Sequence, residues 1–237
     1  PGGYNYPLDE IGVPFIFMNA TSTFRDMITL MHEGGHAIHS FLCKNLEFLP
    51  FKHPTAEVAE LASMSMELLT MDHWNVFFDS EEELLRAKEE HLEQIIETLP
   101  WVAVIDKFQN WIYENPKHSL EERQNAWQDI FDDYHSDIVE YEGLEDYKRI
   151  LWQKQLHIFE VPFYYIEYAI AQLGAISVWI NYRENKEKAL EDYKEGLSLG
   201  YTKRIPEIYD RAGVKFDFSP EHIQKLIDFM YKELLEC

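Results

Sequence analysis

The sequence contains few cysteines and few basic residues. Its two cysteines, Cys43 and Cys237, are too few for a disulfide framework, which favours a reducing compartment and predicts a cytoplasmic location. Lysine and arginine together number 21 against 43 aspartate and glutamate residues, giving a formal net charge of −22. Nucleic-acid phosphates and anionic membrane surfaces attract basic patches. The charge balance therefore predicts neither a nucleic-acid nor a membrane partner.

The sequence also shows no long apolar run, no targeting segment, no internal repeat and no flexible linker. No stretch approaches the roughly 20 apolar residues that a membrane-spanning helix needs, and the N-terminal residues do not have the pattern of a signal peptide. Of the 237 residues, 46% are hydrophobic and 15% are aromatic. This composition predicts a folded chain with a sizeable core, arranged as one large domain or two small ones.

Hydrophobic periodicity predicts a mainly α fold with one or two short strands near the N-terminus. Glycine, proline, tyrosine and asparagine favour a loop over 1–14, and the apolar run over 14–19 favours a strand. Threonine and serine at 21–23 offer N-caps for the helix that follows. We expect that helix to run to about Asn45, and further helices over about 55–78, 80–115 with a kink or break at Pro100, 119–141, 144–160 and from Pro162 to about 184, with two or three more before the C-terminus.

The segment His32-Glu33-Gly34-Gly35-His36 carries the pattern His-Glu-x-x-His in the middle of a predicted helix. Residues four apart lie on one helix face, so both imidazoles can bind one zinc ion. Glu33 can then accept a proton from a water molecule on that ion. The alternative is a pair of surface histidines. Two adjacent glycines inside a helix cost about 1 kcal/mol each relative to alanine, which indicates close approach of another group.

A catalytic zinc ion needs a third protein ligand. A metzincin would place a histidine six residues after His36, but that residue is Leu42. Glu60 follows 28 residues after His32 in a helix of small and apolar residues, where a carboxylate is costly unless paired or metal-bound. We therefore predict Glu60 as the third ligand; the alternative is a solvated acidic face. Three neighbours are candidates to hold the ligands in place, namely His39, Glu57 and Glu67.

Aromatic residues later in the chain are candidates for the second half of an active site. On ideal helical geometry His157, Tyr164 and Tyr168 fall within about 40° of one another, although Pro162 lies between them. These side chains could orient a substrate carbonyl and donate hydrogen bonds to an oxyanion. The alternative is an aromatic core stripe.

Together these features resemble the M3 family of zinc metallopeptidases, specifically its oligoendopeptidase F branch. The resemblance extends over about 170 residues and rests on motifs in the same order, which are Pro1-Gly2-Gly3-Tyr4, the strand over 14–19, His32 to Ser40, Glu57 to Ser63 and His157 to Tyr168.

The resemblance implies a helical zincin-like catalytic domain that hydrolyses internal bonds of short peptides. His32, His36 and Glu60 match the ligands of one zinc ion per chain, and Glu33 matches the general base. His157 and Tyr168 match the residues that bind substrate and stabilise the oxyanion. Tyr164 is a further candidate, because the spacing of these tyrosines varies between branches of the family.

Family members are two to three times as long as this chain. Residues 1–237 therefore resemble only the C-terminal catalytic part, without the N-terminal half. This difference leaves three hypotheses: an active zinc endopeptidase, a weak or inactive zinc-binding fragment that needs an N-terminal partner or self-associates through its exposed cleft surface, and an acidic helical scaffold with coincidental histidines.

Overall fold

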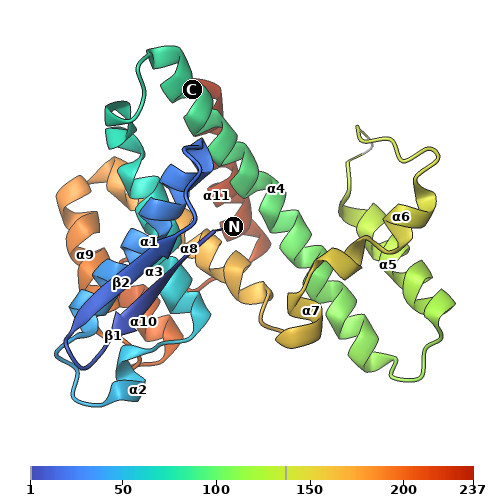
Figure 1. Ribbon diagram of the computed structural model, residues 1–237, viewed down its shortest axis with the longest axis horizontal. Coiled ribbons are helices and arrows are strands. Elements are labelled where there is room, and N and C mark those ends of the chain that lie inside the picture. The colour runs from blue at the N-terminus through green and yellow to red at the C-terminus, as the bar shows by residue number, and fades with distance from the viewer. Residues whose placement is uncertain (1, 137) are drawn as a thin grey trace. The chain divides into compact units, whose positions relative to one another are not determined.

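The computed structural model describes residues 2–136 and 138–237 (Figure 1), so Pro1 of the predicted loop and residue 137 of the predicted helix over 119–141 lie outside it. The chain forms two compact units. Unit 1 comprises Pro1–Glu93 and Ile170–Cys237, and unit 2 comprises Gln94–Ala169. The predicted mainly α fold is confirmed.

Unit 1 begins with an antiparallel hairpin of two strands, β1 (Gly3–Leu8) and β2 (Val13–Met18). The predicted strand is confirmed as β2, but the predicted loop over 1–14 is wrong because it contains β1. The glycine and prolines of this segment suggested turns. Pairing with β2 and packing on the following helix nevertheless hold it in an extended conformation.

The two faces of the hairpin differ in their surroundings. One face packs on helix α1 (Phe24–Cys43), where Gly3 lies against the Thr29 side chain. The other face is exposed and carries three cross-strand apolar pairs, of which Tyr4 and Phe17 stack with ring centroids 5.5 Å apart. We call this exposed set the hairpin ladder; it consists of the pairs Tyr4–Phe17, Tyr6–Phe15 and Leu8–Val13.

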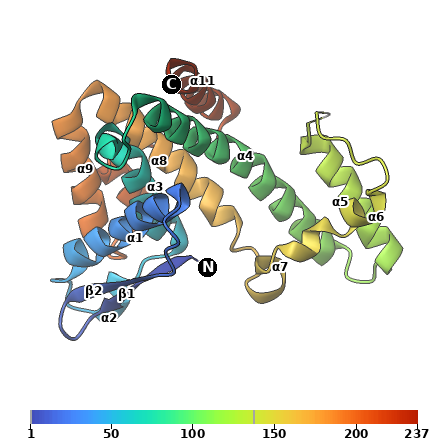
Figure 2. The same ribbon diagram turned by 45° about the horizontal axis from the view of Figure 1, so that its top comes forward.

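The helices of unit 1 pack around α1, α3 and α8, as Figures 1 and 2 show. Helix α1 packs on α3 and on α9, and α10 contacts both α3 and α9. Every residue over 171–180 is buried, so the middle of α8 is enclosed on all sides. Besides α1, the unit contains α2 (Leu49–Lys52), α3 (Ala56–Thr70), the 3-10 helix η1 (Met71–Val76), the first part of α4 (Glu81–Glu114), most of α8 (Ile166–Glu184), α9 (Lys186–Ser198), α10 (Ile205–Arg211) and α11 (Pro220–Glu236).

Unit 2 has an aromatic core of its own. Phe108, Trp127 and Trp152 are almost fully buried there, and the Trp127 indole N–H donates a hydrogen bond to the Lys148 carbonyl. The unit contains the second part of α4, then α5 (Leu120–Tyr134), α6 (Glu145–Arg149), the 3-10 helix η2 (Leu151–Lys154), α7 (His157–Glu160) and the start of α8.

Several predicted helix boundaries need correction. The helix expected over 144–160 is three short pieces, α6, η2 and α7, and the one expected over 119–141 ends at Tyr134. The helix expected over 55–78 changes to 3-10 geometry after Thr70, where the buried Trp74 donates a hydrogen bond to the Thr70 hydroxyl. Helix α4 runs through Pro100 without a break; the buried Ile95 and Val102 stabilise the helix on either side of the proline.

The C-terminal helices follow the prediction. Three helices close the chain, and α11 begins with Ser219 as its N-cap and Pro220 at the first helical position. Among the described residues, no helix combines the length and the apolar character that a membrane span requires.

The two cysteines are free thiols in different environments. Cys43 is 1% exposed and its thiol donates to the Leu197 carbonyl, and burial raises the pKa of Cys43 to about 11. Because the thiolate is the reactive form, we expect a thiol reagent to modify only Cys237 in the native protein and to reach Cys43 after unfolding. Counting modified thiols by mass spectrometry checks this. A Cys237→Ser variant that still reacts before unfolding would contradict it.

Candidate metal centre

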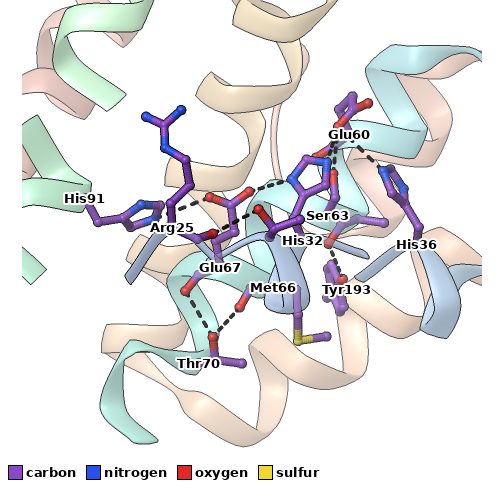
Figure 3. A network of polar contacts seen from close by, with 12 residues as sticks. Arg25, His32, His36, Glu60, Ser63, Met66, Glu67, Thr70, His91 and Tyr193 are labelled. Atoms are coloured by element: carbon purple, nitrogen blue, oxygen red, sulfur yellow. Dashed lines mark hydrogen bonds and ion pairs between the residues drawn. The ribbon is translucent and has the colours of Figure 1, made fainter. Parts of the chain in front are cut away.

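Helix α1 carries the His-Glu-x-x-His segment, and Figure 3 shows its two histidines, His32 and His36, beside Glu60. His32 and His36 are one helical turn apart, with ring centroids separated by 4.9 Å and ring planes at 86°. Glu33 is buried, accepts a hydrogen bond from the Asn5 backbone of β1, and interacts electrostatically with His32. The local spacing therefore brings these groups together, as the sequence predicted.

Helix α3 adds the carboxylate of Glu60 to the two imidazoles. Glu60 Oε2 lies 3.2 Å from His32 Nε2 and 3.8 Å from His36 Nε2. The hydroxyl of Ser63, one turn further along α3, donates to the same carboxylate oxygen at 2.8 Å. The predicted third ligand thus points at both histidines rather than into solvent.

Close approach of the α1 and α3 backbones makes this convergence possible. A Cβ atom at Gly35 would lie 2.6 Å from the Ala62 carbonyl oxygen and 2.6 Å from the Ser63 Cα, which is closer than such atoms can approach. A Cβ atom at Gly34 would meet nothing within 4 Å. The two adjacent glycines therefore differ: Gly35 permits the helix contact, and helix packing places no such demand on Gly34.

The three groups fit a metal ion of the zinc type. One ligand atom from each of His32, His36 and Glu60 lies within 4.8 Å of the others. Tetrahedral coordination at about 2.0–2.1 Å per ligand separates the ligand atoms by roughly 3.3 Å, close to the measured 3.2 and 3.8 Å. Two imidazoles and a carboxylate also match the ligand types of catalytic zinc sites.

Further polar residues hold the first histidine in place. His32 Nδ1 donates to Glu67 Oε1 at 2.6 Å, which leaves Nε2 directed at Glu60. The other oxygen of Glu67 lies 3.5 Å from Nε2 of His91, which is only 3% exposed (Figure 3). Glu67, one of the three predicted supporting residues, therefore contacts His32, and its role in metal binding stays a prediction. His91 did not emerge from the sequence, because its partner Glu67 lies on another helix and is distant in sequence.

The other two supporting candidates have different surroundings. No described hydrogen bond joins His39 or Glu57 to His32, His36 or Glu60. His39 is buried against the backbone of Leu197 in the last turn of α9, and its Nε2 lacks a described partner. Burial lowers the pKa of His39 to about 4.

The electrostatics of the cluster follow from burial and from its carboxylates. Burial by itself would lower the pKa of His32, but the hydrogen bonds to Glu60 and Glu67 outweigh it and raise that pKa to about 10. Burial lowers the pKa of His36 to about 4. Burial opposes ionisation of Glu60, yet the hydrogen bond with His32 keeps its pKa below the usual range. Burial raises the pKa of Glu33.

The predicted aromatic group lies in unit 2. His157 stands at the start of α7, and its ring packs 6.1 Å from that of Tyr164 and 5.7 Å from that of Tyr168. The Tyr168 hydroxyl is 3.5 Å from His157 Nε2. The prediction that the three residues share one helix is wrong. A turn with a positive φ of 62° at Phe163 separates α7 from α8. The three rings converge nevertheless.

Comparison with known proteins identifies relatives of the whole chain. Residues 2–227 match peptidase family M3. An oligoendopeptidase F homolog of Borreliella burgdorferi is 27% identical over 90% of this chain and 35% of its own length, and oligopeptidase PepF of Bacillus subtilis is 25% identical over 94% and 33%.

Solved structures show the same fold. Pz peptidase A, solved with an inhibitor, superposes with a TM-score of 0.89 at 33% identity, covering 100% of this chain and 42% of its own. A protein assigned to oligoendopeptidase F from Bacillus anthracis gives a TM-score of 0.81 at 31% identity, covering 100% and 39%. The chain spans about a third of the length of the curated relatives. With nearly all of its residues matched, the chain belongs to peptidase family M3.

Proposed function

We propose that this chain is the zinc-binding catalytic part of an endopeptidase that hydrolyses internal bonds of short peptides. The observation that carries the proposal is the convergence of two imidazole nitrogens and one carboxylate oxygen, from His32, His36 and Glu60, within 4.8 Å. A zinc ion held by these residues supplies Lewis acidity, which polarises a carbonyl and makes water more acidic.

Glu33 acts as the general base in this proposal. Its carboxylate lies beside the first histidine and is buried between α1 and β1. It takes a proton from the attacking water as the C–O bond forms, and it then delivers that proton to the nitrogen of the leaving amine as the C–N bond breaks. The raised pKa of Glu33 suits both transfers.

His157 and Tyr168 supply the second group of contacts to the substrate. Each can donate a hydrogen bond, to the substrate carbonyl in the ground state and to the oxyanion in the transition state. Tyr164, whose ring stacks nearly parallel to that of His157 at 13°, is the third aromatic residue that we propose to contact the substrate. Short peptides are the proposed substrates because two of the relatives are an oligoendopeptidase F homolog and an oligopeptidase.

Metal content and peptidase activity test the proposal together. Plasma mass spectrometry is expected to find one zinc per chain, and a quenched fluorescent peptide is expected to be cleaved in a chelator-sensitive manner. A chain that holds no zinc even after dialysis against it would contradict the metal site and leave an acidic helical scaffold.

Glu67→Gln is expected to weaken zinc binding by about 10- to 100-fold, because the amide holds the His32 imidazole less strongly than the carboxylate does. Competition with a chromogenic chelator measures the affinity. Glu57→Gln is the matched control, since Glu57 lies on the same helix, α3, without a described hydrogen bond to a ligand residue. Equal zinc affinities of the two variants would show that the 2.6 Å contact does not support the site.

A second candidate function is a zinc-binding part with little activity of its own. Two observations favour it. The chain spans only about a third of the curated relatives, and the hairpin ladder exposes six apolar side chains on one face of unit 1, with Tyr6 61% and Phe15 50% accessible. In this candidate the ladder is covered by polypeptide that corresponds to the remaining two thirds of the relatives.

Zinc binding without cleavage would favour this second candidate over the first. Binding of an apolar dye to the chain, reduced in Phe15→Lys, would confirm that the ladder is accessible. Light scattering that reports a dimer, converted to a monomer by the same substitution, would instead assign the ladder to a second copy and contradict the proposed occupant.

A further inference from the structure

A chain of three hydrogen-bonding side chains runs through unit 2 and ends at His157. Trp101 on α4 lies 3.0 Å from Gln155, measured from the indole Nε1 to the amide Oε1. Gln155 immediately follows η2, and its Nε2 lies 2.6 Å from Nδ1 of His157. Both contacts have the length of a hydrogen bond.

The donor and acceptor chemistry of these groups permits one arrangement. An indole N–H can only donate, so the atom of the Gln155 amide that faces Trp101 must be the oxygen. The amide nitrogen then faces His157 and can only donate, so His157 Nδ1 must present its lone pair. In a neutral imidazole the single proton then resides on Nε2. The indole of Trp101 thus sets the tautomer of a histidine that is two contacts away.

Ring packing holds the imidazole in the matching orientation. Tyr165 lies 4.9 Å from the His157 ring at a tilt of 52°, and Tyr168 meets the ring edge-on at 88°. A ring flipped by 180° would place its Cδ2–H where Nδ1 now accepts the hydrogen bond. Burial also lowers the pKa of His157, against a smaller opposing effect of Glu160, so the ring favours the neutral form.

We propose that Trp101 and Gln155 are positioning residues that fix His157 as a neutral imidazole with its proton on Nε2, so that this atom serves as a hydrogen-bond donor. Within the described residues the Tyr168 hydroxyl faces it at 3.5 Å, the long limit of a hydrogen bond. A peptide carbonyl can therefore compete for this proton. Only this consequence for the substrate rests on the proposed function, because the tautomer follows from the three side chains alone.

The substitution Gln155→Glu is designed to reverse the tautomer. One carboxylate oxygen can still accept from Trp101, while the other requires a proton on His157 Nδ1. The variant therefore leaves Nε2 unprotonated, or holds the ring as an imidazolium with both nitrogens protonated. Gln155→Leu removes both contacts, and Trp101→Phe keeps the ring packing while it releases the amide orientation.

Nitrogen-15 NMR of the full chain reads the tautomer directly. The His157 signals are identified by their loss in His157→Gln. In the wild type, Nδ1 is expected to resonate as an unprotonated nitrogen and Nε2 as a protonated one. Gln155→Glu is expected to protonate Nδ1, and Trp101→Phe to give a mixture of the two tautomers. A proton on Nδ1 in the wild type, or unchanged nitrogen signals in Gln155→Glu, would overturn the inference.

Peptidase kinetics separate this inference from the proposed function. If His157 donates to the substrate through Nε2, a Gln155→Glu ring with Nε2 unprotonated is expected to lower kcat/KM by about 10²-fold, the size of effect seen when one oxyanion donor is lost. A Gln155→Glu ring held as an imidazolium, which the nitrogen signals distinguish by two protonated nitrogens, keeps the Nε2 donor and is expected to retain kcat/KM. A tautomer that reverses without any change in kcat/KM would leave the positioning role intact and contradict the proposed role of His157 itself.

Discussion

Replacing Glu33 with glutamine is expected to lower peptide hydrolysis by about 10²- to 10⁴-fold, the usual contribution of general acid–base catalysis, while zinc remains bound. Glutamine has nearly the shape of glutamate and can occupy the same buried place between α1 and β1. It cannot accept a proton from water, and the three candidate zinc ligands are unchanged. The measurement pairs kcat/KM for a quenched fluorescent peptide with zinc content, using the metal-free protein as the baseline.

Glu60→Gln is the matched control, because it makes the same chemical change at the predicted ligand. It is expected to lower zinc affinity and hydrolysis together, since an amide oxygen carries no charge to offset that of the metal. Glu33→Gln should therefore lower kcat/KM without lowering zinc content, whereas Glu60→Gln should lower both. Full activity in Glu33→Gln would contradict the role of Glu33, and zinc loss in that variant would place Glu33 among the metal ligands.

Much of the candidate metal centre was predictable because its geometry is local. The spacing of His32 and His36 fixes their common face on any helix. Glu60 was recognisable from a different principle, the cost of a carboxylate among small apolar residues. The structure places it 3.2 Å from the first histidine. Both inferences needed only that the surrounding segments be helical, which periodicity predicted.

The errors lie where tertiary contacts override local preference. Residues of β1 read as turn formers, and pairing with β2 makes them a strand. Pro100 suggested a kink or a break, and burial of the flanking residues keeps α4 continuous, so the break is wrong and the kink stays a prediction. His91 and Gln155 could not be assigned roles from the sequence, because each acts through a partner distant in sequence, Glu67 for the one and Trp101 for the other.

Gly35→Ala is expected to disrupt the helix contact on which the metal centre depends. The new methyl group would lie 2.6 Å from the backbone at both Ala62 and Ser63. Both contacts are with the backbone of α3, so the helix as a whole would have to move away. The gain in helix propensity, about 1 kcal/mol, is opposed by overpacking that costs typically 1–3 kcal/mol or more. Because Glu60 lies on the displaced helix, zinc affinity should also fall by about tenfold or more.

Gly34→Ala isolates the packing effect, because it makes the same substitution one residue earlier where a Cβ atom meets nothing within 4 Å. It is expected to retain zinc affinity and to gain up to about 1 kcal/mol of stability from helix propensity. Urea unfolding of the metal-free proteins separates stability from metal binding, and chelator competition then measures affinity. Equal stabilities and zinc affinities for the two variants would mean that α1 and α3 leave room for a methyl group at Gly35, contrary to the 2.6 Å contacts. The position of Glu60 would then need another cause.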